Sequence, residues 1–286
     1  MRTSKKNPLL KPYLKWAGGK RQLLPEIRKH IPENINNLTY YEPFVGAGAV
    51  LFDLQPQKAV INDFNAELIL TYRVIKDHVE ELIQELKKHK EHNDETYYYD
   101  MRAQDRDKEE FSHLNDIEKA GRLIFLNKTC YNGLYRVNSR GLFNVPYGKY
   151  KNPAICEEPV LWAVHLYLNS NSITIMNGDF EAVAKEAASK SFVYFDPPYH
   201  SQDKTNFTGY QADGFNDDEQ IRLRDTFLYL TKKDIPCLLS NSDTPFIRDI
   251  YKDKSFDIIT VSAKRAINSV ADGRGNVNEV LIKNRK

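Results

Sequence analysis

The chain has few cysteines and lacks any long apolar segment. Its 286 residues include only Cys130, Cys156 and Cys237, which are widely spaced and form no CxxC pair. An odd number of scattered cysteines argues against a disulfide framework and against a zinc site. No apolar run approaches the length of a membrane span, and the basic N-terminal segment lacks the apolar stretch of a secretory signal. These absences predict a cytoplasmic protein with no membrane association and no metal site.

The chain also lacks a strong overall charge, since its net charge is only +2. With 41% hydrophobic and 28% charged residues, it has the composition of an ordinary globular protein, and its length allows one large domain or one domain with an insertion. The charge is unevenly distributed: residues 119–152 contain seven Lys or Arg and no Asp or Glu. Aromatic residues are interleaved with these basic ones, which favours a nucleic-acid surface over a merely solvated basic face.

Strand-like and helix-like segments alternate along most of the chain. We expect a long amphipathic helix at about 65–92, helices near 217–233 and after Thr244, and an irregular, partly helical segment at 93–171 that includes a hairpin-like stretch. The expected strand segments are LTYYEPF, KAVINDF, SITIMNGDF, SFVYFDPPY, PCLLSNSD, FDIITVSA and NEVLIKN. This alternation predicts a doubly wound α/β sheet built from residues 1–92 and 172–286. Residues 93–171 are then an inserted, mainly helical domain that carries a β-hairpin.

A glycine-rich turn follows the first expected strand. Gly46 and Gly48 lie in "EPFVGAGAV", and Asp63 ends the next strand. Such a turn lets the backbone approach a ligand at the carboxyl edge of a sheet, where a carboxylate can accept both hydroxyls of a ribose. The pattern lacks the third glycine of a dinucleotide fingerprint, because position 51 is Leu. It favours a nucleoside-containing cofactor.

A second glycine pair lies in "KWAGGK", residues 15–20, which is not a phosphate-binding P-loop. The first glycine of that motif would fall on Leu14, and position 21 is Arg rather than Ser or Thr. The alternative is a surface turn beside a core tryptophan. We prefer a binding role because Trp16, two glycines and two lysines are concentrated in six residues.

The segment "SFVYFDPPYHS" runs from an apolar strand directly into a carboxylate and two prolines. Asp196 offers hydrogen-bond acceptors only, and Pro197 and Pro198 have no backbone N–H. The turn therefore suits a ligand that presents two hydrogens, such as an exocyclic amine, while Tyr199 offers an aromatic face to a planar ring. Two acceptors would also stabilise positive charge that develops on that nitrogen as it is alkylated. A rigid turn at a strand end is the alternative explanation.

Taken together, these motifs resemble the DNA adenine methyltransferase (Dam) family, whose members act on GATC. The matching segments occur in the family's order and span nearly the whole chain: KWAGGK, EPFVGAGAV, INDFNAEL, NGLYRVNSRGLFNVPYGKYKNP, GDF, DPPY and LSNSD. DPPY is shared with other amino-group methyltransferases, whereas the NGLYRVNS segment is much more specific. The resemblance implies transfer of a methyl group from S-adenosylmethionine to the N6 amine of an adenine flipped out of duplex DNA, without a metal.

The resemblance also implies individual roles. Trp16 and Lys20, with Gly18 and Gly19 between them, are expected at the methionine end of the cofactor. The loop around the cofactor is expected to contain Glu42, Phe44, Gly46 and Gly48. Asp63 would hold the ribose, and Asp179 and Phe180 the cofactor's adenine. Asp196, Pro197, Pro198 and Tyr199 would hold the target adenine, with Asp196 also facing the cofactor.

The inserted domain is expected to read the DNA sequence through a hairpin at about 131–150, because the major groove admits a two-stranded ribbon. Arg136 is the expected guanine contact and Leu134 the contact to a thymine methyl group. Tyr131 could fill the space left by the flipped adenine, with Asn132 on the orphaned thymine. The remaining expected DNA contacts are Asn138, Arg140 and Lys149, the last two on phosphates.

Other functions remain open from the sequence. An RNA adenine N6 or a DNA cytosine N4 methyltransferase could use the same DPPY site. An NAD-dependent oxidoreductase would leave DPPY unexplained, and a non-catalytic DNA-binding regulator would leave Asp196 without a purpose. Pairing with a restriction endonuclease and the oligomeric state are not determined by the sequence.

Overall fold

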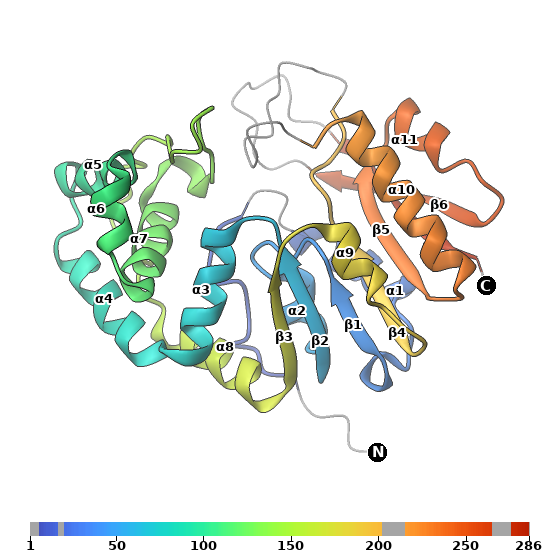
Figure 1. The fold of residues 1–286 in the computed structure, drawn as a ribbon, viewed down its shortest axis with the longest axis horizontal. Coiled ribbons are helices and arrows are strands. Elements are labelled where there is room, and N and C mark those ends of the chain that lie inside the picture. The colour runs from blue at the N-terminus through green and yellow to red at the C-terminus, as the bar shows by residue number, and fades with distance from the viewer. Residues whose placement is uncertain (1–5, 17–19, 202–214, 265–275, 286) are drawn as a thin grey trace.

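The computed structural model describes residues 6–16, 20–201, 215–264 and 276–285, and its centre is a seven-stranded sheet (Figure 1). The strands lie in the order β3-β2-β1-β4-β5-β7-β6. The first five are parallel, and β7 is antiparallel to both of its neighbours. Their bounds are β1 Thr39–Glu42, β2 Lys58–Asp63, β3 Ser172–Asn177, β4 Ser191–Phe195, β5 Cys237–Ser242, β6 Phe256–Lys264 and β7 Asn276–Asn284. The expected α/β sheet is confirmed.

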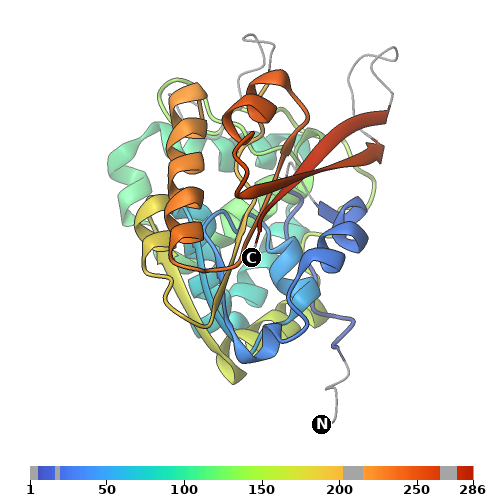
Figure 2. The same ribbon diagram turned by 90° about the vertical axis from the view of Figure 1, so that its right-hand side faces the viewer.

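Helices cover both faces of this sheet, as the edge-on view of Figure 2 shows. Helices α9, α10 and α11 pack on one face, and α1, α2, α3 and α8 on the other. The helices are α1 Leu24–His30, α2 Ala49–Leu54, α3 Ala66–Asp77, α4 Val79–Glu91, α5 Glu95–Ala103, α6 Lys108–His113, α7 Asp116–Thr129, α8 Glu158–Ser170, α9 Phe180–Lys185, α10 Asp217–Lys232 and α11 Pro245–Ile250. Among the described residues, none of these helices has the length and apolarity needed to cross a membrane.

The alternation of side chains along the strands divides the buried residues into two clusters. In β4, Phe192 and Tyr194 belong to the cluster under α2 and α3, whereas Val193 and Phe195 belong to the cluster under α9 and α10. Successive strand residues point to opposite faces, so a strand buried on both faces must be apolar throughout. This explains why the segment before Asp196 is a continuous apolar run.

Helices α4 to α7 form a helical group beside α3 (Figure 1). Helix α7 packs against both α3 and α4, and it begins with a capping box in which Asn115 and Glu118 each accept from the other's backbone N–H. The first buried cluster runs without a break from Leu68 in α3 through Leu82 in α4 to Leu123 in α7. The division of the chain at residues 92 and 93 stays a prediction.

The expected single helix over 65–92 is wrong. The backbone leaves the helical region at His78 (φ −139°, ψ 42°), which ends α3 and begins α4. The apolar residues Ile75 and Val79 keep a four-residue spacing across the break, and both are buried. The apolar pattern therefore continued through a position at which the backbone turns.

The hairpin-like segment 131–150 forms two arms without a regular strand among the described residues. Isolated antiparallel bridges join Cys130 to Tyr147 and Val137 to Phe143. The backbone N–H of Tyr131 donates to the carbonyl of Pro146, and this proline has no N–H with which to continue a ladder. We call residues 131–150 the recognition segment below.

Candidate functional site

The polar residues that follow β1, β2, β3 and β4 meet at one edge of the sheet. These strands are parallel neighbours, and Glu42, Asp63, Asp179 and Asp196 lie at or just after their carboxyl ends. Ligands of open α/β sheets bind at this edge, where the order of the strands reverses between β1 and β4. The structure thus brings together the residues that the sequence singled out, although their individual roles stay predictions.

The glycine-rich turn after β1 is joined to the end of β2. Gly46 and Gly48 have positive φ values of 51° and 76°, a conformation that favours glycine. The N–H of Gly46 donates to Asp63 Oδ2 at 3.1 Å, and the Tyr72 hydroxyl donates to the Gly46 carbonyl at 2.9 Å. A Cβ atom at Gly46 would lie 3.1 Å from Cδ1 of Trp16. The turn is therefore packed closely against Trp16.

The carboxylate of Asp63 is held in place by backbone donors. Oδ1 accepts from the N–H of Asn65 at 2.9 Å, and Oδ2 accepts from Gly46. Burial raises the pKa of Asp63 to about 6, although these donors act in the opposite direction. Phe64, the next residue, is 59% exposed and was not singled out by the sequence analysis. This strand end thus presents an oriented carboxylate beside an accessible aromatic ring.

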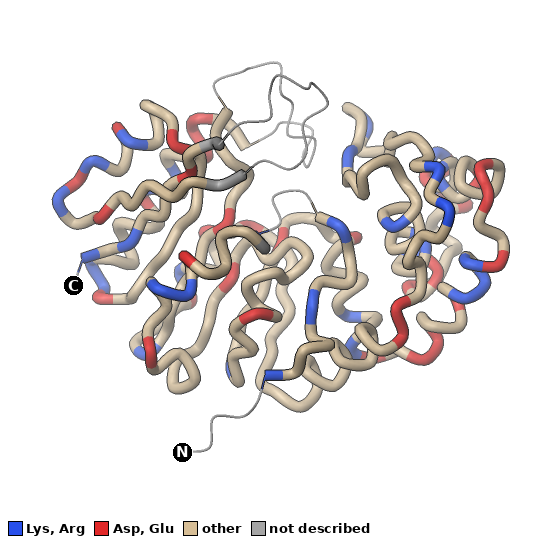
Figure 3. The backbone as a smooth tube through the Cα atoms, turned by 180° about the vertical axis from the view of Figure 1, so that it is seen from behind, with Lys and Arg blue, Asp and Glu red and all other residues tan. Residues whose placement is uncertain are grey.

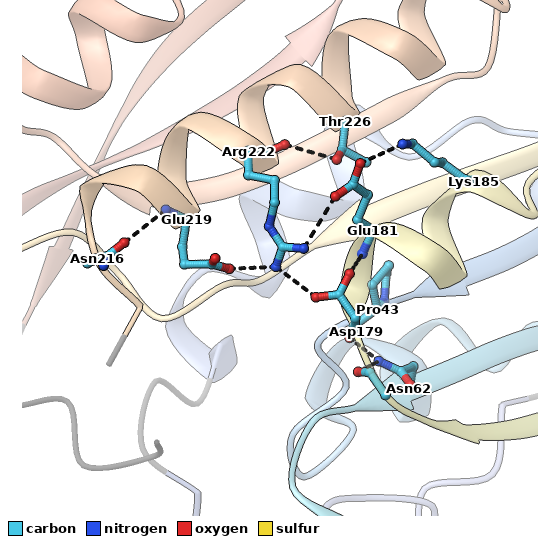
Figure 4. Close-up of polar contacts among 10 residues, drawn as sticks. Pro43, Asn62, Asp179, Glu181, Lys185, Asn216, Glu219, Arg222 and Thr226 are labelled. Carbon is cyan, nitrogen blue, oxygen red and sulfur yellow. Dashed lines mark hydrogen bonds and ion pairs between the residues drawn. The ribbon is translucent and has the colours of Figure 1, made fainter. Parts of the chain in front are cut away.

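Asp179 forms part of an ionic cluster that the sequence did not reveal (Figure 4). It caps α9 by accepting from the N–H of Glu181, and Nη2 of Arg222 donates to its Oδ2 at 2.7 Å. Arg222 also pairs with Glu181 at 3.3 Å and with Glu219 at 2.6 Å. Burial would raise the pKa of Asp179, but the Arg222 guanidinium outweighs this effect and holds that pKa below its ordinary value.

The ring of Phe180 has two close neighbours. Its ring stacks on Phe44 with 5.1 Å between the centroids, and the Arg222 guanidinium lies 4.5 Å from the centroid of the Phe180 ring. Phe180 is buried. A planar ligand can stack on Phe180 only if one of these neighbours moves, so the expected adenine contact stays a prediction.

Asn62 links two loops at this edge, a role that the sequence analysis missed. Its Nδ2 donates to the carbonyls of Pro43 and Gly178, both at 3.0 Å (Figure 4). These carbonyls belong to the loops that follow β1 and β3. Because the Asn62 side chain is buried, it fixes the spacing between the turn at Gly46 and the segment that begins α9.

A buried ion pair holds Asp196. Lys20 Nζ lies 2.6 Å from Asp196 Oδ1, and the hydroxyl of Ser240 donates to the same atom at 3.1 Å. Only 4% of Lys20 is exposed. Burial raises the pKa of Asp196, and the ion pair with Lys20 limits the rise. Both partners bind Oδ1, which leaves Oδ2 as the oxygen that a ligand would meet.

Tyr199 is oriented by two further groups. Its hydroxyl donates to Glu279 Oε2 at 2.8 Å, and Lys20 Nζ lies 4.5 Å from the centroid of its ring. Glu279 lies on β7 and was not foreseen, since 80 residues separate it from Tyr199. The Tyr199 ring is thus held beside the Lys20–Asp196 pair by the hydrogen bond of its hydroxyl and by the ammonium group over its face.

Glu42, which was expected in the loop around the cofactor, is buried. Burial raises the pKa of Glu42 well above its ordinary range, and its carboxyl group accepts from the Tyr40 hydroxyl at 2.9 Å. This carboxyl group is therefore enclosed by protein. Gly18 and Gly19 lie outside the described residues.

The recognition segment presents several of its expected DNA contacts to solvent. Tyr131 is 49% exposed, and Asn132, Arg136, Arg140 and Lys149 are exposed as well. Arg136 donates through Nε to the Asn144 side chain at 2.7 Å. These positions are accessible to a large partner.

Two other expected contacts shape the segment itself. The Asn138 side chain accepts from the N–H groups of Arg140 and Leu142, so it builds the turn at the tip. Leu134 is half-buried and packs against the first core cluster. Lys149 lies 3.7 Å from Glu95.

The basic block at 119–152 is not wholly a surface. Arg122 is buried and pairs with Asp105 at 3.0 Å, and the buried Lys128 pairs with Glu157 at 2.7 Å. Of the interleaved aromatic residues, Phe125, Tyr135 and Phe143 are core residues. Figure 3 accordingly shows Lys and Arg positions interspersed with Asp and Glu positions along the backbone. Only part of this block can contribute to a nucleic-acid surface.

In the part of the chain that the structure describes, no group of three or more His, Cys, Asp or Glu residues could hold a metal ion. His89 and His92 lie three residues apart in the sequence, a spacing that could in principle serve a metal ion. Nδ1 of His89 instead forms a hydrogen bond with the Tyr97 hydroxyl at 2.7 Å. The His89 ring stacks on Phe125 in the core.

Comparison with known proteins gives consistent results. The family model for D12 class N6 adenine-specific DNA methyltransferases matches residues 16–267. The chain is 47% identical to the type II methyltransferase M1.LlaDCHI of Lactococcus lactis subsp. cremoris, covering 96% of this chain and 95% of that protein. It is 44% identical to the type II methyltransferase M.MjaIII of Methanocaldococcus jannaschii, covering 96% and 99%. It is also 35% identical to the DNA adenine methylase of Escherichia coli K12, covering 94% and 93%.

Proposed function

The chain belongs to the D12 class N6 adenine-specific DNA methyltransferase family, and from this premise we propose that it methylates the adenine of GATC in duplex DNA, with S-adenosylmethionine as donor. That the enzyme acts on the N6 amine of DNA adenine follows from the family. The donor, the sequence and the residues in each role are the proposal. The observation that carries it is the Asp196 carboxylate, held by Lys20 and Ser240 at the sheet edge that also carries Gly46 and Asp63.

The residues at this edge fit S-adenosylmethionine. A cofactor with a ribose, an amino-acid group and a positively charged sulfur needs acceptors, and the edge supplies the oriented carboxylate of Asp63 and a closely packed glycine turn. Asp63 would accept from the ribose hydroxyls, while Trp16 and Lys20 would border the methionine end. When bound, the cofactor supplies an activated methyl group. The exposed Phe64 offers an additional surface for the adenine ring of the cofactor.

Asp196 and the proline carbonyls act on the target adenine. The N6 amine is a weak nucleophile because its lone pair is delocalised into the ring. Asp196 Oδ2 accepts one N6 hydrogen, a carbonyl of the Pro197–Pro198 turn accepts the other, and Tyr199 packs against the base. As the nitrogen gains its new bond, positive charge grows on N6 and the ionised carboxylate stabilises it. The N6 proton is lost after transfer, because the neutral amine is too weak an acid to lose it first.

Lys20 opposes protonation of this carboxylate. Burial favours the neutral acid, and a neutral carboxyl group stabilises a developing cation poorly. The ammonium group 2.6 Å from Oδ1 opposes this effect without occupying Oδ2. The ion pair therefore favours the ionised form of a carboxyl group that burial alone would tend to protonate.

The recognition segment supports the choice of duplex DNA. Its exposed Arg136 can donate to the paired acceptors of a guanine, and the exposed Tyr131 can occupy the space left by the flipped base. We also propose that the enzyme works in the cytoplasm. Two of its relatives are named type II methyltransferases, which favours pairing with a restriction endonuclease.

Substitution of Asp196 tests the site. Asp196→Ala should abolish transfer of tritiated methyl groups from S-adenosylmethionine to duplex DNA while the protein stays folded. An exposed carboxylate such as Asp100 provides the matched control as Asp100→Ala. Near-normal turnover of Asp196→Ala would refute the assignment, and equal labelling of RNA would refute the choice of DNA.

Two further substitutions test sequence reading. Arg136→Ala should cost about 1–3 kcal/mol and relax the preference at one base pair, as loss of a base contact does. Lys149→Ala should weaken binding to all sequences alike and reduce its salt dependence, as loss of a phosphate contact does. Methylation profiles over GATC and its near-cognate sites separate the two outcomes. A common factor at every site for Arg136→Ala would eliminate the base-reading role.

A further inference from the structure

Two buried amide side chains hold the main chain of the loop Asp196–His200. Gln220 of α10 donates through Nε2 to the carbonyl of Pro198 at 2.9 Å. Asn241 of β5 donates through Nδ2 to Gln220 Oε1 at 3.0 Å, and its own Oδ1 accepts from the N–H of His200 at 3.0 Å. Neither amide side chain is exposed to solvent. The pair therefore spans from the carbonyl of Pro198 to the N–H of His200.

The direction of each hydrogen bond in this series is determined by the groups at its two ends, the Pro198 carbonyl and the His200 N–H. The Pro198 carbonyl can only accept, so the NH2 group of Gln220 must face it. The Gln220 oxygen then faces the NH2 group of Asn241. At the far end, the N–H groups of His200 and Ser242 can only donate, and both point at the Asn241 oxygen. Reversal of either amide would oppose two donors or two acceptors inside the protein.

The neighbours of Asn241 hold other parts of the same loop. Ser240 donates to the Asp196 carboxylate at 3.1 Å, and Ser242 donates to the His200 carbonyl at 2.5 Å. Successive side chains of a strand point to opposite faces, so Asn241 faces Gln220 while both serines point to the other side. The LSNSD motif, of which only Ser240 has a role in the proposed chemistry, thus holds the loop from two sides.

The loop needs such external support because its own sequence provides little. Pro197 and Pro198 have no N–H, so neither can anchor the turn by donating a backbone hydrogen bond. A proline carbonyl is nevertheless one of the two acceptors proposed for the target amine. Because the carbonyl of Pro198 already accepts from Gln220, we assign the carbonyl of Pro197 as the acceptor that pairs with Asp196 Oδ2.

We propose that Gln220 and Asn241 are positioning residues for methyl transfer, which act by aiming the Pro197 carbonyl and the Asp196 carboxylate at the same nitrogen. This inference rests on the proposed role of Asp196 to Tyr199. Neither amide touches the target base. Their effect is geometric, and displacement of a reacting group by about 1 Å can slow a reaction roughly 100-fold.

The isosteric change Gln220→Glu tests this role, because it removes the donor to the Pro198 carbonyl and keeps the shape. In single-turnover methylation of a duplex with one site, we expect the rate constant to fall about 100-fold. The dissociation constants for S-adenosylmethionine and for DNA should each stay within about twofold of the wild type, since the pair touches neither binding surface. Gln84→Glu, at an exposed position of α4, is the matched control and should behave as the wild type.

Asn241→Asp gives a second measurement. It removes the donor to Gln220 and keeps the acceptor for the His200 N–H, so it also serves if Gln220→Glu fails to fold. The two substitutions break one chain of bonds, and the double variant should therefore be little slower than the slower single variant. Rate losses that multiply in the double variant overturn the proposal.

Two other results also overturn it. One is a folded Gln220→Glu or Asn241→Asp enzyme with a rate within threefold of the wild type. The other is a rate loss matched by equal losses of cofactor and DNA affinity, which indicates general disruption. Asp196→Ala is measured in parallel: if it remains active, the proposed site itself is wrong, whereas an inactive Asp196→Ala beside a fully active Gln220→Glu removes only the role of the amides.

Discussion

Replacement of Asp63 by Asn should change how the stability of the protein depends on pH. The pKa of Asp63 rises from its ordinary value of 3.8 to about 6 in the folded protein, because burial disfavours the charged form. The folded state therefore binds this proton more tightly than the unfolded state. The associated stability is fully present below pH 3.8 and is lost as the pH rises through about 6.

The size of the effect follows from the two pKa values. At about 1.4 kcal/mol per pH unit, the rise corresponds to a loss of about 3 kcal/mol above pH 6 in the absence of cofactor. About 1.4 kcal/mol of this loss falls between pH 5 and pH 7.5, a range in which urea unfolding is practicable. The Asn side chain does not titrate and lacks this term. It leaves one of the two N–H donors, from Gly46 or Asn65, facing an NH2 group, a cost of about 1–3 kcal/mol that is independent of pH.

The decisive quantity is a double difference. The free energy of unfolding of Asp63→Asn minus that of the wild type should be about 1.4 kcal/mol more positive at pH 7.5 than at pH 5, since other titrating groups cancel. The affinity of the wild type for S-adenosylmethionine, measured by calorimetry, should fall about tenfold as the pH is lowered from 7.5 to 5, because Asp63 becomes protonated. The affinity of the variant should be weak and independent of pH over this range. Asp100→Asn, exposed on α5, is the matched control. A double difference of zero would refute the reasoning.

Two further substitutions have clear expectations. Lys20→Met removes the cation that opposes the effect of burial on Asp196, so the pKa of Asp196 should rise further. The acid limb of the pH–rate profile should therefore move to higher pH. An unchanged acid limb would contradict the role given to the ion pair. Asn127→Ala removes the bonds from Asn127 to the backbone N–H and carbonyl of Lys15 and to the carbonyl of Gly133. Urea unfolding should show a loss of about 1–3 kcal/mol, and the affinities for cofactor and DNA should fall together; a loss confined to one ligand would show that this contact does not link the two surfaces.

The sequence predicted where the strands lie along the chain but not their order in the sheet. A strand buried on both faces is a continuous apolar run, and such runs at 192–195 and 237–239 are visible without a structure. The break at His78 was not visible, because the apolar spacing from Ile75 to Val79 is the same in a straight helix. The insertion of β7 between β5 and β6 depends on packing of the whole sheet, for which no local pattern exists.

The positions of the site residues followed from the motifs, but the groups that hold them did not. Asp179 meets Arg222 across 43 residues, and Tyr199 meets Glu279 across 80 residues. A charged residue on a helix gives no indication of its distant partner. For the same reason the basic block was overestimated, because Arg122 has its acidic partner in an earlier, separate segment.

The position of β7 has a consequence for the order in which the molecule can assemble during synthesis. Strand β6 pairs only with β7 among the described strands, so it has no partner until residues 276–284 have left the ribosome. Strand β7 also carries Glu279, whose carboxylate accepts a hydrogen bond from the Tyr199 hydroxyl. Because domains fold as units once their long-range partners exist, a nascent chain that stops short of β7 would leave β6 unpaired and Tyr199 without its hydrogen bond to Glu279. Premature methylation by an incomplete chain is thereby disfavoured.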